Sequence, residues 1–138
     1  MQKDLQPKEV VLDQNGNILA IILDTNLTNS KKEFHTKSDQ NFQVGTFNLD
    51  SGDSLERHVH LENIRTVNNT SEVLIIQKGE LNVEIFDHLK NFVVKKILKK
   101  GTLILFIEGG HSFKADKSCK FIEIKQGPYS EGLDKEKF

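Results

Sequence analysis

The chain has 138 residues, of which 36% are hydrophobic and 28% charged, and 19 basic residues against 20 acidic ones leave a formal net charge of -1. This composition is typical of one folded domain, so we expect residues 1–138 to form a single domain. It excludes a multidomain enzyme and a disordered regulator, and the balanced charge gives no basis for binding nucleic acid.

The sequence also gives no basis for a membrane protein. Its longest apolar run, residues 18–23, is far shorter than the roughly 20 residues that a membrane-spanning helix requires. The first residues lack the apolar region of a signal peptide, and Cys119 is the only cysteine. We therefore expect a cytoplasmic protein without disulfides.

Short apolar or alternating segments, separated by turns rich in glycine, asparagine and aspartate, predict strands and almost no helix. In chain order these segments are 9–12, 18–23, 42–49, 55–61, 72–77, 81–85, 92–98, 102–107, 111–114 and 120–125. Asn15 and Gly16 predict a hairpin turn between the first two segments. About ten short strands, followed by a polar tail over 127–138, predict an all-β antiparallel sandwich or barrel.

Two histidines in the segment 55–61 are arranged as a chelating pair. His58 and His60 are separated by one residue, so on a strand both imidazoles would point to one face, about 7 Å apart. Such a pair binds a metal when further ligands arrive from neighbouring strands. The alternative is a pair of exposed histidines on an edge strand.

Glu72 and His111 are the expected partners of this pair. Glu72 is in phase with the apolar Leu74 and Ile76, so its carboxylate would face the core, at a cost of several kcal/mol unless a cation or hydrogen-bond donors compensate it. His111 follows a Gly-Gly pair that allows close approach of the backbone. If no metal is present, an arginine such as Arg57 or Arg65 is the alternative partner of Glu72.

The order of these residues resembles the two motifs of the cupin superfamily. Gly52, five residues, His58-Val59-His60, and then Glu72, six residues and Gly79 are similar to the first motif, within residues 52–79. Gly101, five residues and Ile107-Glu108-Gly109-Gly110-His111 are similar to the second, within residues 101–115. The resemblance implies an antiparallel jelly-roll barrel, a double-stranded β-helix, in which His58, His60, Glu72 and His111 bind one divalent metal.

The sequence departs from both motifs at several positions. Eleven residues separate His60 from Glu72, where the family usually has three or four, and this insertion, 61–71, contains Arg65. In the second motif, Ile107 replaces the usual proline, His111 comes one residue early, and Ala115 replaces the usual asparagine. All four expected ligand types are nevertheless present.

The ligand set suits iron, manganese, nickel or zinc. We expect a site for a small polar metabolite, such as a sugar derivative, with Arg65, Phe113 and Tyr129 as residues that could line it. The resemblance allows isomerase, epimerase or dioxygenase chemistry, because one fold supports many reactions. One alternative is a binding module without turnover, whose metal is structural or docks the ligand. Another is a metal-free sugar epimerase, which would need Tyr129 as its acid.

Two further expectations concern the surface. We expect a homodimer, with the apolar segments 10–12 and 18–23 as candidates for the contact. His35 and His88 lie in polar stretches, so we expect both to be exposed to solvent.

Overall fold

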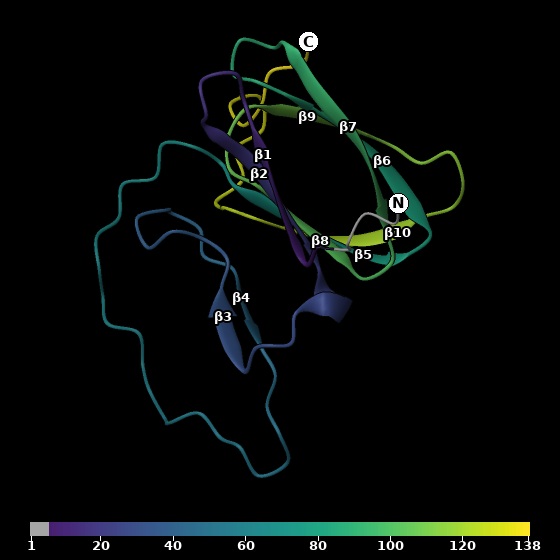
Figure 1. Ribbon diagram of the computed structural model, residues 1–138. Helices are drawn as coiled ribbons and strands as arrows, with labels where there is room; N and C mark the ends of the chain where they lie inside the picture. The colour runs from purple at the N-terminus through teal and green to yellow at the C-terminus, as the bar shows by residue number, and fades with distance from the viewer. Residues whose placement is uncertain (1–5) are drawn as a thin grey trace.

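The computed structural model describes residues 6–138 and contains three antiparallel sheets (Figure 1). The five-stranded sheet has the order β1 (Lys8–Leu12), β2 (Ile18–Asp24), β8 (Thr102–Phe106), β5 (Glu72–Lys78), β10 (Lys120–Lys125). The three-stranded sheet has the order β7 (Phe92–Lys99), β6 (Glu80–Phe86), β9 (Gly110–Lys114). A separate hairpin joins β3 (Lys32–Phe34) to β4 (Gly45–Phe47), and η1 (Thr25–Leu27) is a single 3-10 turn. The prediction of an all-β antiparallel fold is confirmed.

The main core lies between the five-stranded and three-stranded sheets. Alternate residues of each strand face inward, such as Leu74 and Ile76 on β5 and Val83 and Ile85 on β6, and all four are at most 1% exposed. The two sheets thus form a sandwich, and no strand pairing among the described residues joins them into a closed barrel.

A second apolar cluster covers the outer face of the five-stranded sheet. Here Ile21 and Leu105 are buried under Phe42 and Val44, which precede β4. These contacts attach the loop that connects β3 to β4 to the sheet. The hairpin is therefore anchored to the sandwich although its two strands pair only with each other.

The two turns β1–β2 and β6–β7 are built in the same way, each around an aspartate. Asp87 Oδ1 accepts hydrogen bonds from the backbone N–H groups of Leu89 and Asn91, at 2.9 and 2.8 Å, and Asp87 Oδ2 accepts one from Asn91 Nδ2 at 3.0 Å. Asp13 makes the corresponding bonds to Asn15 and Asn17. Hydrogen bonding to the asparagine lowers the pKa of each aspartate.

Replacing Asp87 with alanine is expected to lower the melting temperature by several degrees at pH 7, because two backbone donors lose their acceptor. The folded-state pKa of Asp87 is lowered, so its stabilising contribution is present above the ordinary carboxyl pKa and is lost as the pH falls through the folded-state value. Melting curves of both proteins between pH 7 and pH 2 would test this. A difference that stays constant over this range would contradict the assignment.

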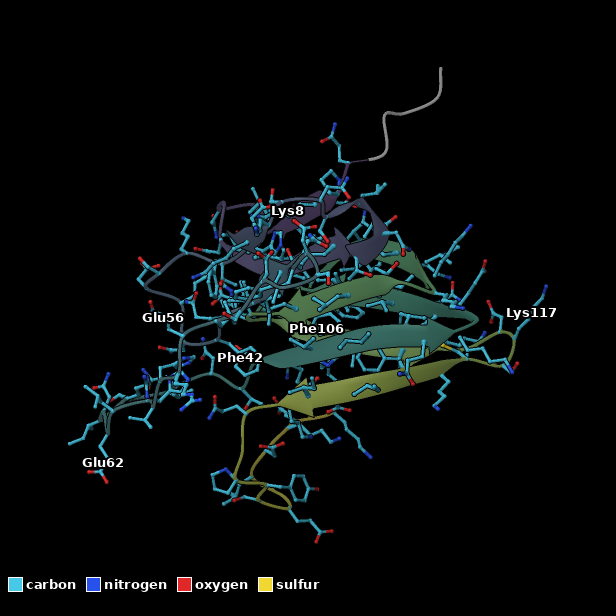
Figure 2. The ribbon with its side chains drawn as sticks, turned by 90° about the horizontal axis from the view of Figure 1, so that it is seen from below. Lys8, Phe42, Glu56, Glu62, Phe106 and Lys117 are labelled. Carbon is cyan, nitrogen blue, oxygen red and sulfur yellow. The ribbon has the colours of Figure 1, made fainter. Side chains whose placement is uncertain are left out.

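The structure differs from the predicted strands mainly between residues 30 and 71. β3 was not predicted, and only Gly45–Phe47 of the segment 42–49 is a strand. The segment 55–61 has no regular secondary structure and pairs with no strand, so the strand prediction there is wrong for this structure. We refer to residues 48–71, which connect β4 to β5, as the arm. Figures 1 and 2 show the arm projecting away from the sheets, with Glu62 far from them.

The two segments expected to join copies of the chain differ in their exposure. Residues 18–23 belong to β2, which is an inner strand between β1 and β8. Val10 and Leu12 on β1 are 40% and 47% exposed. Among residues 6–138, no helix is long and apolar enough to cross a membrane.

Candidate functional site

Two of the four expected ligands lie together at one end of the sandwich. Glu72 begins β5 of the five-stranded sheet, and His111 lies on β9 of the three-stranded sheet. Both share the inward face of their strand with core residues, Leu74 after Glu72 and Phe113 after His111. The His111 Nε2 atom lies 3.0 Å from Glu72 Oε2, and the two side chains are 24% and 16% exposed. The pair is thus half-buried and accessible from solvent.

Two phenylalanines hold the imidazole of His111. The ring of Phe106, the cross-strand neighbour of Glu72, stacks on it with centroids 4.1 Å apart. The ring of Phe113 stacks at 4.9 Å with an interplanar angle of 14°. Because aromatic stacking restrains the plane of the imidazole, Nε2 stays directed at the Glu72 carboxylate.

The charge of Glu72 is favoured by its surroundings. The hydrogen bond from His111 is the largest cause that lowers the pKa of Glu72, and it acts against partial burial, which raises it. Positive charge on His111, Lys125 and Lys135 lowers this pKa further. The carboxylate is therefore ionised at neutral pH and available as an acceptor or a ligand.

Lys125, opposite Glu72 on β10, adds a cation beside the pair. Burial alone would lower its pKa, but the nearby carboxylates of Glu123 and Glu72 outweigh burial and raise it. Its Nζ lies 3.5 Å from Glu123 Oε1 and 3.7 Å from Asp134 Oδ2. Lys125 was not predicted as a site residue. Its position on the same face of the strand as Phe121 and Glu123 is the pattern that could have indicated it.

Near this end of the sandwich, the C-terminal tail runs from β10 of the five-stranded sheet to β6 and β9 of the three-stranded sheet. Tyr129 is 62% exposed, and its ring lies over Lys125, with the Nζ atom 5.3 Å from the centroid. Further along, the ring of Phe138 meets that of Phe86 at 5.1 Å and lies against Gly110, directly before His111. No local pattern in this mainly polar tail predicts which residues its aromatic rings contact.

The other two expected ligands lie elsewhere. His58 and His60 are exposed on the arm, with their ring centroids 5.3 Å apart. Together with Phe34 and Phe47 of the β3–β4 hairpin they line a groove of about 520 Å³, which contains neither Glu72 nor His111. The two histidines are thus close to one another, as expected, but separate from the Glu72–His111 pair.

The remaining predicted positions are distributed as follows. Phe113 lies beside His111, whereas Arg65 is exposed on the arm. His88 is exposed as expected, but His35 is buried, so the exposure predicted for it is wrong. The β3–β4 pairing turns the His35 imidazole inward, and its Nε2 atom lies 2.9 Å from Thr46 Oγ1.

One imidazole nitrogen and one carboxylate are the donors that this end of the sandwich provides for a metal. They are of the right chemical kind for a transition metal but too few to hold one alone. Within the described part of the chain, no three histidine, cysteine, aspartate or glutamate side chains are grouped as a metal site. A complete set would require the arm to bring His58 and His60 to Glu72 and His111.

Comparison with protein-family models, with curated proteins and with solved structures found no match to this chain.

Proposed function

We propose that this protein is a jelly-roll protein of the cupin type that binds one divalent transition metal between its sheets and a small polar metabolite beside it. The ligands in this proposal are His58, His60, Glu72 and His111. The observation that carries it is the 3.0 Å approach of His111 Nε2 to Glu72 Oε2, from opposing sheets. A half-buried imidazole and an ionised carboxylate at an open end of a sandwich are typical of a ligand-binding site.

The chemistry of the four side chains is consistent with iron, manganese, nickel or zinc. Glu72 and His111, which already lie together, come from β5 and β9, and the packed core between the two sheets fixes these strands in place. The missing two lie on the arm, whose residues 55–61 would complete a jelly roll if they paired beside β9. In that position the alternation of the segment would turn His58 and His60 toward His111.

The surroundings of the pair favour a polar, oxygen-rich ligand. Phe106 and Phe113 provide neighbouring apolar surfaces beside His111, while Lys125 and Glu123 supply hydrogen-bonding groups on β10. Sugar derivatives combine apolar ring faces with hydroxyl groups and match such a lining. A bound metal would polarise a carbonyl or hydroxyl of the ligand or activate water. Isomerisation, epimerisation and dioxygen chemistry are the reaction classes that the cupin resemblance implies.

The metal function predicts a specific response to added metal. After treatment with a chelator, the wild-type protein should melt at a higher temperature when one of the four metals is added. Metal at about a hundred times its Kd stabilises the folded state by about 2.7 kcal/mol. The variants Glu72→Gln and His111→Ala should lose this response, whereas His88→Ala, which removes an exposed histidine in the β6–β7 turn, should keep it. Equal responses in all four proteins would contradict the proposed ligands.

One observation favours a second candidate, a metal-free binding module. In the pair as it stands, His111 already compensates the half-buried charge of Glu72. For such a module, none of the four metals would change the melting temperature. A panel of sugars and sugar phosphates would instead raise it, and Glu72→Gln would abolish that rise.

A further inference from the structure

The arm exposes apolar side chains on a segment that projects away from the sandwich. Val59 and Leu61 are each 82% exposed, and Ile64 is 99% exposed. Figure 2 shows Glu56 nearer the sheets and Glu62 at the far end of the projection. Exposed apolar residues gathered on one projecting segment mark a surface that is covered by another element.

A matching surface is the open edge of the three-stranded sheet. Among residues 6–138, β9 pairs with β6 on one side and with no strand on the other. The backbone groups along that edge are free to accept another strand. Side chains directly opposite each other on paired strands lie about 4.5–5.5 Å apart. A strand added there would therefore bring its inward side chains next to His111 and Phe113.

The alternation of residues 55–61 fits this edge. With His58 and His60 turned inward, Val59 and Leu61 lie on the opposite face of the added strand, together with Ser112 of β9. The same pairing brings both imidazoles toward His111 and, through it, toward Glu72. One register thus supplies the two missing ligands and removes exposed backbone from the β9 edge.

The arm is held away from the β9 edge of its own chain. Its histidines line the groove beside Phe34 and Phe47, and the loop that connects the two strands of this hairpin is attached to the sandwich through Phe42 and Val44. Closure within one chain would require the segment to leave the hairpin. Pairing with a second copy requires the same release of His58 and His60 from the groove, but the arm already projects away from the sandwich of its own chain, and exchange of identical elements is a low-cost route to a symmetric dimer.

We propose that two copies of the chain exchange their arms, each arm adding a strand to the β9 edge of the other copy and bringing His58 and His60 to that copy's Glu72–His111 pair. The identity of the metal ligands rests on the proposed function. The exchange itself rests on the projecting arm and the open edge. Each metal site then contains residues of both copies.

Co-expression of two chains that each lack two of the four ligands tests this arrangement, with the metal content as the measurement. One chain carries His58→Ala and His60→Ala, and the other carries Glu72→Gln and His111→Ala, so neither alone has four ligands. When they are co-expressed, a mixed dimer has one intact site, and random pairing restores about one quarter of the wild-type metal content. As a control, a chain carrying only Glu72→Gln is mixed with a chain carrying only His111→Ala. This mixture should restore no site, because the Glu72 and His111 of each site come from the same copy. A mixture that stays metal-free while the wild-type protein binds metal overturns the exchange.

A cross-link tests the exchange independently of any metal. In a Cys119→Ser background, chains with Val59→Cys are mixed with chains carrying Ser112→Cys or Lys114→Cys, the residues of β9 that face away from the core. Disulfides require Cα atoms within about 7 Å, so the mixture should give a covalent dimer only if the arm pairs with β9 of another copy. Lys95→Cys is the matched control. Lys95 and Ser112 both pair with Glu84, but Lys95 lies on β7 at the opposite edge of the sheet, so this variant should give no covalent dimer. Chains with either cysteine alone control for dimers joined through identical positions.

The two experiments separate the exchange from the metal function. A covalent dimer from a protein that binds no metal supports the exchange and contradicts the metal function. If one chain carrying both Val59→Cys and Ser112→Cys forms only an internally linked monomer, the arm closes on its own sheet and the exchange is overturned. Absence of any cross-link also overturns it.

Discussion

The variant Gly109→Ala is expected to lose about 2–4 kcal/mol of unfolding free energy, one of the largest effects of any single substitution in this chain. Gly109 has φ +84°, and a Cβ atom built on it would lie 2.3 Å from the carbonyl oxygen of Phe86. Both the left-handed backbone and the contact with another main-chain atom oppose a side chain here. Because Gly109 lies two residues before His111, the variant should also displace that imidazole. The close backbone approach predicted for the Gly-Gly pair is confirmed.

Gly52→Ala provides the matched control for this effect. Gly52 has a similar φ of +92°, but its Cβ would meet no atom within 4 Å. It should lose only the conformational contribution, about 1–2 kcal/mol. Urea unfolding of both variants measures the difference. Equal losses would show that the contact with Phe86 is absent in solution.

Ile104→Ala is expected to lose about 2–5 kcal/mol, because it removes a fully buried side chain from the centre of the five-stranded sheet. Ile104 is 0% exposed and pairs with Ile22 on one side and Leu74 on the other. Truncation would leave a cavity between the two sheets, beside Leu74 on the strand that begins with Glu72. Urea unfolding should show the loss as a lower midpoint with an unchanged slope.

The same substitution at Ile122 tests whether the inner face is correctly assigned. Ile122 lies on the edge strand β10, on the outer face, and is 42% exposed. Ile122→Ala should cost about 1 kcal/mol or less. A loss at Ile122 as large as that at Ile104 would contradict the assignment of the faces.

Most of the strands could be predicted from local pattern, because apolar side chains on one face of a strand must alternate with polar ones. Residues 81–85 are an example, and they lie within β6 of the structure. The Asn15–Gly16 turn was also predictable, since Gly16 adopts φ +84° between β1 and β2. In these regions local preference and tertiary packing agree.

The arm is the region where local pattern was insufficient. In residues 55–61 apolar and polar side chains alternate as they do on a strand. A strand forms only where the edge of another strand pairs with it, and the alternation does not specify that partner. β3 was missed for the converse reason, since its three residues are all exposed and carry no apolar alternation. The tail contacts of Tyr129 and Phe138 likewise depend on segments far away in the sequence.

The candidate site was predictable in part for the same reasons. Because Glu72 alternates in phase with the core residues Leu74 and Ile76, its inward orientation could be predicted. Its partner in the structure is His111 and not an arginine. The stacking of Phe106 and the cation at Lys125 depend on cross-strand register, which a single sequence does not encode directly. The positions of His58 and His60 depend on where the arm docks.

Elemental analysis of the protein, purified without an affinity tag and without added metal, tests the central claim most directly. We predict about one equivalent of iron, manganese, nickel or zinc per chain, as expected for one four-ligand site. This metal should be lost in His58→Ala and in Glu72→Gln and retained in His88→Ala. A folded protein that contains none of these metals, and that binds none when each is added, would contradict the account.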